Sequence, residues 1–513
     1  MNKVAILDFG SQVTQLIARR FREFGVYCEL FPYDVDIKKL EEFAPSGIVL
    51  SGGASSVYDD NAPIRDLEPL LSMAPTLGIC YGMQLICHQL GGQVKAADNR
   101  EYGLNQVRWK NCFSDNFSKK LAGNSQKVWM SHGDFVEKTP ANFELLATSE
   151  GGHPAAIRSD RVWAVQFHPE VTHTEFGSEI LKAFLFDLCK IEADWQPKEI
   201  VSQLKENIQK QVGDDDHVLL GISGGVDSSV VASLLTSTLG PERVHCVFVN
   251  NGLLRKNEYL QVLELYKGIG LNVHGVDAEE RFLSELRGIS DPEKKRKTIG
   301  RVFIEVFDQS VKDLGLNCKF LAQGTLYPDV IESVSLRGSG VTIKSHHNVG
   351  GLPEKMNMSL VEPLRELFKD EVRAIGRELG LPSEVLMRHP FPGPGLAVRI
   401  LGDITREKIE ILQNADNVFI SSLKESGLYD EIWQAFVALL PVQSVGVQGD
   451  GRSYERACVL RAVTSQDGMT ADWFDFPPDF MRKVSNRITN EVKGINRVVY
   501  DITSKPPGTI EWE

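Results

Sequence analysis

Apolar positions gather in short runs along the first 190 residues, and longer stretches of mixed polarity separate these runs. Residues 4–7, 47–50 and 76–79 form compact, largely apolar runs typical of buried strands. Residues 13–24 and 83–90 are of mixed polarity and have the length of helices. Strands that alternate with helices predict an α/β domain with a mainly parallel sheet, in which active sites lie at the carboxyl ends of the strands.

The same alternation returns after a polar linker at 192–199. A predicted helix at 200–212 leads into the predicted strands 217–222, 244–249, 273–276 and 320–322. These strands are separated by helical stretches, which indicates a second doubly wound parallel sheet.

A connector rich in proline and glycine at 391–396 marks a further change of pattern. Beyond it, we expect strands at 442–447, 457–463 and 497–502 and helices at 406–414, 430–440 and 479–492. The expected fold class is therefore α/β: two doubly wound, mainly parallel-sheet domains, 1–190 and 191–387, and a small α+β domain, 388–513. The sheet of the last domain is expected to be free to pair with another copy, as in a homodimer.

Composition narrows the class of protein. A chain of 513 residues, of which 42% are hydrophobic, has room for about three globular domains. Its net charge of −13 argues against a general nucleic-acid binder. Its eight cysteines contain no C-x-x-C pair, which favours a reducing compartment over a zinc site or a disulfide framework. Without a signal peptide or a run long enough to span a membrane, we expect a cytoplasmic protein with no membrane partner.

The loop 223–229, of sequence SGGVDSS, lies between a predicted strand and a predicted helix. Its glycines allow a close approach of the backbone to an anion, and the start of the helix attracts negative charge. It lacks the lysine of a loop that contacts a terminal phosphate, but Asp227 favours a magnesium-bridged pyrophosphate. A tight turn that uses its glycines only for packing is the alternative. The loop resembles that of the ATP pyrophosphatases, which implies ATP-binding roles for Ser223, Gly224, Gly225, Val226, Asp227, Ser228 and Ser229.

Cys80 follows a predicted strand and stands between Gly78 and Gly82, as the serine does in a nucleophile elbow. The following helix favours a reactive thiolate, and the N–H of Tyr81 can face a developing oxyanion. Another predicted strand is followed by a His-Pro-Glu sequence, which contains His168 and Glu170. A histidine can act as the base for the thiol, and a nearby carboxylate can orient the imidazole.

A glycine loop at 51–54 supplies a possible second oxyanion donor, Gly53, although an ordinary turn is an equally simple explanation of that loop. Together these three loops resemble a class I glutamine amidotransferase. The resemblance implies that Cys80, His168 and Glu170 are catalytic. It also implies oxyanion and glutamine-binding roles for Gly53, Tyr81, Gln84, Ser131, His132, Gly133 and Asp134.

Positive charge for a leaving pyrophosphate is expected from Lys344 and Lys369. Residues 338–352, rich in glycine, serine and histidine, have the composition of a lid. The basic cluster at 294–297, expected just before a helix, is either a solvated face or a clamp for the phosphate of a nucleotide substrate. We favour the clamp.

The final residues, 505–513, read KPPGTIEWE, and this proline-stiffened sequence predicts a docked rather than a frayed segment. With the FPGPG connector and the two preceding domains, it resembles the glutamine-hydrolysing GMP synthases. That resemblance implies that XMP, ATP and glutamine are the substrates and that Mg²⁺ accompanies ATP. It also implies that Asp227 is a magnesium ligand and that no organic prosthetic group is needed. XMP contacts are implied for Arg296, Gln448, Lys505, Ile510 and Glu511.

Two alternatives remain open at this point. Another amidotransferase-fed adenylating ligase, of the NAD or asparagine synthase type, would act on a carboxylate and give the final residues no role. A binding module descended from enzymes would have no glutaminase activity, although the presence of Cys80, His168, Glu170 and Asp227 argues against it.

Overall fold

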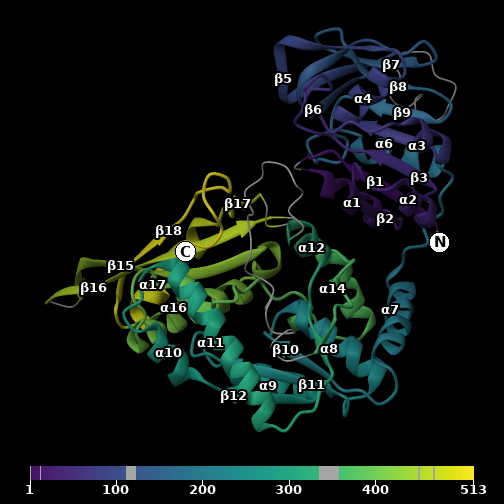
Figure 1. Ribbon diagram of the computed structural model, residues 1–513. Coiled ribbons are helices and arrows are strands. Elements are labelled where there is room, and N and C mark those ends of the chain that lie inside the picture. The colour runs from purple at the N-terminus through teal and green to yellow at the C-terminus, as the bar shows by residue number, and fades with distance from the viewer. Residues whose placement is uncertain are drawn as a thin grey trace. The chain divides into compact units, whose positions relative to one another are not determined.

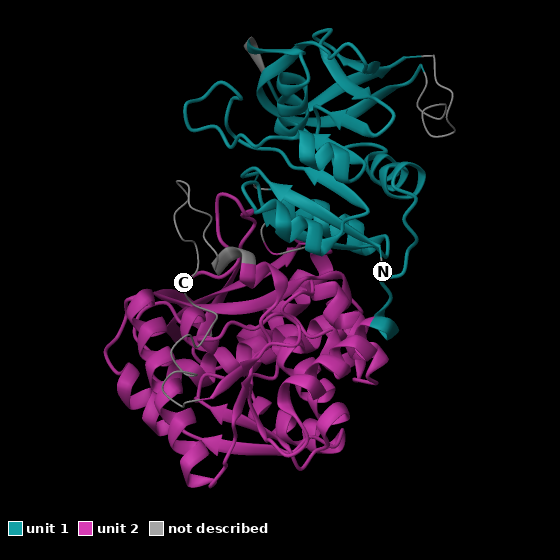
Figure 2. Ribbon diagram, turned by 45° about the vertical axis from the view of Figure 1, so that its right-hand side comes forward, with its two compact units in different colours: residues 1–199 teal, residues 200–513 magenta. Residues whose placement is uncertain are grey.

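The computed structural model describes residues 2–513 except 12, 111–122, 334–357, 449–450, 466–467 and 469, and it leaves out the side chains of 97–100, 331–333 and 448. The chain forms two compact units, Met1–Glu199 and Ile200–Glu513 (Figure 2). The predicted boundary near residue 387 falls within the second unit and stays a prediction.

In the first unit, nine strands of the described residues form one sheet in the order β2-β1-β3-β4-β9-β8-β7-β5-β6 (Figure 1). The strands are β1 (Lys3–Asp8), β2 (Tyr27–Pro32), β3 (Gly47–Leu50), β4 (Thr76–Ile79), β5 (Gln93–Trp109), β6 (Ser125–Lys138), β7 (Glu144–Ser149), β8 (Pro154–Arg158) and β9 (Val162–Val165). The helices are α1 (Thr14–Glu23), α2 (Ile37–Phe43), α3 (Glu68–Met73), α4 (Tyr81–Gln89) and α6 (Gly177–Lys182), which a π-helical turn (Ala183–Leu188) continues. The first five strands in this order, β2, β1, β3, β4 and β9, are parallel to one another. The remaining strands, β8, β7, β5 and β6, pair antiparallel with their neighbours.

In the second unit, α7 (Pro197–Val212) precedes a sheet whose described strands run in the order β12-β11-β10-β13-β14, all parallel. They are β10 (Val218–Ile222), β11 (Val244–Asn250), β12 (Val273–Asp277), β13 (Phe320–Ala322) and β14 (Ser359–Val361). Their helices are α8 (Val226–Leu239), α9 (Glu258–Gly268), α10 (Glu279–Leu286), α11 (Pro292–Asp313), α12 (Tyr327–Ser333), α14 (Lys369–Glu378) and α15 (Ser383–Leu386).

The last part of this unit holds a smaller sheet, in which the long hairpin of β15 and β16 extends outward (Figure 1). Its elements are a 3₁₀ turn (Gly395–Arg399), α16 (Arg406–Glu425), a second 3₁₀ turn (Tyr429–Glu431), β15 (Gln434–Gln448), β16 (Gly451–Thr464), β17 (Asp472–Trp473), α17 (Pro478–Glu491) and β18 (Ile495–Tyr500). One apolar core joins the two sheets: Leu219 and Val247 of the first belong to the same cluster as Phe419 of α16 and Leu460 of β16.

The predicted fold class is confirmed, and most predicted strands lie within one or two residues of the observed ones. The helix predicted at 430–440 is wrong, because most of that segment belongs to β15. Its apolar run is too short to distinguish a buried strand from a buried helix by periodicity. Pairing with β16, in which Phe436 lies opposite Arg461, decides in favour of the strand. The basic cluster at 294–297 lies inside α11 rather than before a helix.

Candidate functional site

Three loops of the first unit converge because the strands that precede them are neighbours. β3, β4 and β9 lie side by side and parallel, so the residues that follow them meet at one edge of the sheet. These residues are Gly52 and Gly53 after β3, Cys80 after β4, and His168 after β9. The sequence prediction placed its candidate chemistry at this edge.

Cys80 forms a strained strand-to-helix turn. Its φ of 52° lies in the left-handed region, which non-glycine residues rarely adopt, and it immediately precedes α4. A Cβ at Gly82 would lie 2.3 Å from the main-chain oxygen of Leu50, and one at Gly78 would lie 2.9 Å from the main chain of Gly82. The turn therefore requires glycine on both sides of the cysteine.

His168 and Glu170 form a buried pair. The Nδ1 atom of His168 lies 2.7 Å from Oε1 of Glu170, and neither side chain is more than 5% exposed. Burial alone would lower the pKa of His168, but the Glu170 carboxylate and a hydrogen bond with Cys80 together raise it well above its usual value. The hydroxyl of Thr174 donates to the His168 carbonyl at 2.6 Å and so holds the loop. The imidazole is placed to exchange a proton with the thiol.

The glycines after β3 lie against this pair. A Cβ at Gly52 would lie 2.9 Å from Cε1 of His168 and 3.5 Å from Cβ of Cys80, and one at Gly53 would lie 2.7 Å from the carbonyl oxygen of Phe9. Only glycine fits at either position. Tyr81, with no exposed surface, anchors the start of α4 by donating its hydroxyl to Pro63 O at 3.2 Å.

Residues 131–134 lie within β6, where Ser131 and Asp134 come close to α4. The carbonyl oxygen of Ser131 lies 3.7 Å from Sγ of Cys80. The side-chain nitrogen of Gln84 donates to the carbonyl oxygen of Asp134 at 2.9 Å. Gly133 stands between His132 and Asp134 in the same strand. The structure thus brings this segment to Cys80.

His132 has a partner that the sequence prediction missed. Its Nε2 lies 3.2 Å from Oε2 of Glu101, the residue opposite it in β5. Hydrogen bonding to His132 lowers the pKa of Glu101 despite its partial burial. A cross-strand pairing of this kind has no signal in the linear sequence.

Gln166 was also missed. Its Nε2 lies 3.8 Å from Sγ of Cys80, and its Oε1 accepts from Gln84 at 3.4 Å, while the residue is only 2% exposed. The Gln166 amide is thus a hydrogen-bond donor directed at the sulfur of Cys80. The available signal was a single amide within an apolar run, two residues before His168.

The glycine loop of the second unit follows β10 and opens α8. Gly224 has a φ of 75°, and a Cβ there would lie 2.9 Å from the Arg388 guanidinium. The hydroxyls of Ser223 and Ser228 lie 3.4 Å apart at the exposed side of the loop. Ser229, in contrast, is fully buried, and its hydroxyl lies 2.6 Å from that of Tyr266.

Among the described residues, Lys369 and Arg388 bring positive charge to this loop. Lys369, the first residue of α14, donates to Oδ2 of Asp227 at 2.5 Å. Arg388, which the sequence prediction did not single out, donates to the main-chain oxygen of Gly224 at 2.8 Å and pairs with Glu258. Burial, together with the charge of a neighbouring arginine, lowers the pKa of Arg388 to about 10. The predicted Lys344 and the 338–352 segment lie outside the described residues.

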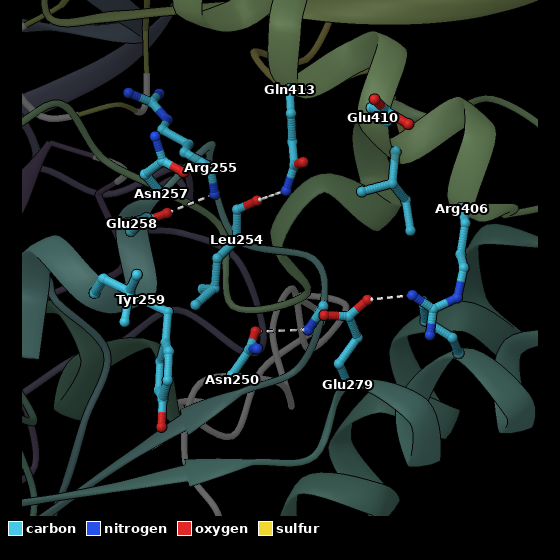
Figure 3. A pocket seen from close by; sticks show the side chains of 14 residues that line it. Asn250, Leu254, Arg255, Asn257, Glu258, Tyr259, Glu279, Arg406, Glu410 and Gln413 are labelled. Atoms are coloured by element: carbon cyan, nitrogen blue, oxygen red, sulfur yellow. Dashed lines mark hydrogen bonds and ion pairs between the residues drawn. The ribbon is translucent and has the colours of Figure 1, made fainter.

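A cavity of about 340 Å³ opens beside the carboxyl end of β11 (Figure 3). Its lining mixes polar and apolar side chains. Among the polar ones, Arg406 donates to Glu279 at 2.8 Å, and Gln413 donates to the carbonyl oxygen of Leu254 at 2.7 Å. Glu258, another lining residue, belongs to the pair with Arg388. The ion pair of Arg388 and Glu258 therefore links the glycine loop to the wall of the cavity.

The residues predicted to contact XMP lie in several places of the second unit. Arg296, on α11, donates to the main-chain oxygen of Glu513, and Glu511 is bound by the fully buried Arg399 at 2.8 and 3.1 Å. Ile510 is buried in a small apolar cluster, and Lys505 donates to the carbonyl oxygen of Gly468 at 2.7 Å. The segment 505–513 is docked. Gln448 ends β15, and its side chain lies outside the description.

Three family models match the chain. They are glutamine amidotransferase class-I over residues 5–188, NAD synthase over 197–298, and the GMP synthase C-terminal domain over 421–512. Full-length relatives cover the whole sequence. A glutamine-hydrolysing GMP synthase from Bdellovibrio bacteriovorus is 62% identical over 515 residues, with all of both chains covered. Those from Chlorobaculum tepidum and Cytophaga hutchinsonii are each 54% identical and cover all of this chain, which covers 99% of each of them. The chain belongs to the glutamine-hydrolysing GMP synthases.

Proposed function

We propose that the protein converts XMP, ATP, glutamine and water into GMP, AMP, pyrophosphate and glutamate. The observation that carries this proposal is identity along the full length to glutamine-hydrolysing GMP synthases, at 62% with one of them. The convergence of Cys80, His168 and Glu170 at one sheet edge supports the glutamine half-reaction.

In the proposed glutamine reaction, Sγ of Cys80 attacks the side-chain amide carbon of glutamine and forms a thioester. His168 gives a proton to the departing ammonia, and Glu170 keeps the imidazole oriented and charged. The N–H groups of Gly53 and Tyr81 stabilise the oxyanion. Water then releases glutamate. Gln84 and residues 131–134 shape the glutamine site, as their contacts around Cys80 suggest.

In the proposed ATP reaction, residues 223–229 hold the pyrophosphate, and Lys369 supplies charge beside them. O2 of the xanthine base attacks the α-phosphorus of ATP, and pyrophosphate leaves. Ammonia then attacks C2 of the adenylated base and displaces AMP, which gives GMP. Because no bond to the protein forms in this half of the reaction, the contribution of the loop is orientation and electrostatic stabilisation.

Asp227 fits a magnesium site. Its Oδ2 is bound to Lys369, but its Oδ1 is buried and has no hydrogen-bond partner among the described residues. Mg²⁺ in nucleotide enzymes is bound by one or two carboxylates together with the phosphates of the substrate. We propose that Asp227 is such a ligand, and the ion would neutralise phosphate charge when bound.

We further propose that XMP contacts Arg296, Gln448, Lys505, Ile510 and Glu511. The protein is proposed to be a homodimer through the last domain, because the β15–β16 hairpin exposes apolar side chains, among them Val447 at 77% and Tyr454 at 61%. Such a patch suits a partner surface.

We propose that the chain divides into 1–190 for the glutamine reaction, 191–387 for ATP binding, and 388–513 for dimerisation and most of the XMP contacts. Cytoplasmic location is proposed because the cysteines within the described ranges form no disulfide bond with one another. None of the helices in those ranges is long and apolar enough to cross a membrane.

Phosphorus NMR of ATP and magnesium incubated with XMP and glutamine tests the function. AMP and pyrophosphate that form only with XMP present are the expected products. ADP and phosphate would refute the role given to residues 223–229. AMP and pyrophosphate that ignore XMP but respond to a carboxylate acceptor would favour an NAD synthase type of ligase, whose family model matches residues 197–298.

A further inference from the structure

Lys295, on the first turns of α11, is a charged side chain with no exposed surface. Its ammonium group donates to three oxygens: the carbonyl oxygens of Ala397, at 3.2 Å, and Ile400, at 2.7 Å, and Oε2 of Glu513. An ammonium has three donors, so all of them are used. The ammonium of Lys295 is therefore bonded only to protein oxygens, and no donor is left for solvent or for a ligand.

Glu513 is held at both ends by one stretch of α11. Its side chain is bound by Lys295 and accepts from the N–H of Gly402 at 3.3 Å, while its main-chain oxygen accepts from the guanidinium of Arg296. Two consecutive basic residues, Lys295 and Arg296, thus both bind Glu513. The side chain of Glu513 is 9% exposed, so the ion pair with Lys295 is shielded from solvent.

A buried ion pair of this kind is a poor source of stability, because two apolar side chains of similar volume would serve the fold as well or better. Its directional hydrogen bonds, in contrast, permit only one placement of Glu513. Glu511, two residues earlier, is fixed in the same manner by the buried Arg399 and by Gln434 at 2.7 Å. The geometry of these contacts specifies the path of residues 510–513.

We infer that Lys295 is a positioning residue for XMP: its bond to Glu513 fixes Arg296 and Glu511 in the arrangement that binds this substrate. The inference rests on the proposed function, in which Arg296 and Glu511 contact XMP. Lys295 itself touches no substrate, because its donors are all used within the protein. It acts through Glu513, which the proposed XMP contacts do not include.

Four variants test this inference: Lys295→Gln, Glu513→Gln, Glu513→Asp and, as a matched control on the same helix, Lys312→Gln. Lys312 pairs with Asp308 and its side chain is 65% exposed. Steady-state GMP formation is measured with saturating ammonium, so that the glutamine site plays no part. We expect the KM for XMP to rise on the order of 10- to 100-fold in Lys295→Gln and Glu513→Gln, with the KM for ATP unchanged.

Glu513→Asp keeps the charge on a shorter side chain, so its KM for XMP should lie between those of the original protein and Glu513→Gln. A purely structural role predicts something else: a lower melting temperature, with kcat and both KM values affected alike. Should Lys295→Gln fail to fold, Glu513→Gln carries the test, because it leaves Lys295 bonded to two carbonyl oxygens.

Glu511→Gln separates this inference from the proposed function. If Glu511→Gln raises the KM for XMP but Lys295→Gln and Glu513→Gln do not, the positioning role is refuted and the proposed XMP site stands. If Glu511→Gln leaves that KM unchanged, the proposed XMP site is wrong and the inference falls with it.

Discussion

Replacing Glu170 by Gln tests the glutamine half-reaction most directly. Glutamine keeps the shape of the side chain and removes its charge. The carboxylate lies 2.7 Å from Nδ1 of His168, with both side chains buried, so its charge acts on the imidazolium almost unscreened by solvent. Two unit charges with centres about 4 Å apart interact by about 4 kcal/mol at an effective dielectric constant of 20.

That energy is available when His168 is positive, as it is in the proposed reaction once the imidazole has taken the proton of Cys80. Each 1.36 kcal/mol corresponds to a factor of ten in rate, so Glu170→Gln should lower glutamine-dependent GMP formation about 10³-fold. With ammonium in place of glutamine, the same variant should work at the original rate. Glu144→Gln is the control, because its carboxylate pairs with Arg158 on the surface at 2.9 Å.

The pH dependence of glutaminase activity in Glu170→Gln should shift in a defined direction. Glu170 raises the pKa of His168, so the imidazolium persists to higher pH than that of an ordinary histidine. Removing the carboxylate lowers this pKa, and the alkaline limb of glutaminase kcat/KM should move to lower pH. An unchanged limb together with an unchanged rate would refute the role of Glu170. Equal losses with glutamine and with ammonium would mean that the variant disturbs more than this site.

Three further substitutions have distinct expected outcomes. Gly82→Ala places a Cβ 2.3 Å from Leu50 O, which should destabilise the first unit by about 1–3 kcal/mol in urea unfolding and abolish glutaminase activity. Asp227→Asn should lower XMP-dependent pyrophosphate release about 100-fold, since Lys369 loses its partner and the loop its carboxylate, while glutaminase activity persists. Gln166→Leu should slow alkylation of Cys80 by iodoacetamide at neutral pH about tenfold, because the sulfur loses its amide donor; an unchanged alkylation rate would contradict the contact.

Most of the fold could be predicted from the sequence because its strands are compact apolar runs bounded by polar loops. β3 and β4 match their predicted bounds residue for residue. The error at 430–440 arose where β15 contains a continuous apolar run, AFVALL, with no alternation to indicate a strand. Only its pairing partner, β16, distinguishes the two possibilities, and a single sequence does not contain that information.

The candidate glutamine site could be anticipated because parallel strands bring their carboxyl ends together, so residues after β4 and β9 meet without any knowledge of side-chain packing. Side-chain contacts between segments far apart in the sequence could not be anticipated in this way. Glu101 opposite His132 and Arg388 against Gly224 both depend on register or on chain paths that only the folded protein defines. The basic cluster on α11 illustrates the same limit, because its pattern allowed a solvated face or a phosphate clamp, and neither describes the buried Lys295.

The connector after α15 shows how one short segment can relate two substrate sites. Its first residue, Arg388, holds the glycine loop, and Leu396 donates to the carbonyl oxygen of Leu253 at 2.8 Å, beside the cavity at the end of β11. Arg399 then binds Glu511, and Gly402 binds Glu513. The segment 388–402 therefore contacts the loop proposed for pyrophosphate and the residues proposed for XMP. Attack of a base oxygen on phosphorus requires the two substrates at a fixed separation. Pro390, Pro392 and Pro394 restrict the backbone of this segment, and that stiffness suits a segment that sets the separation.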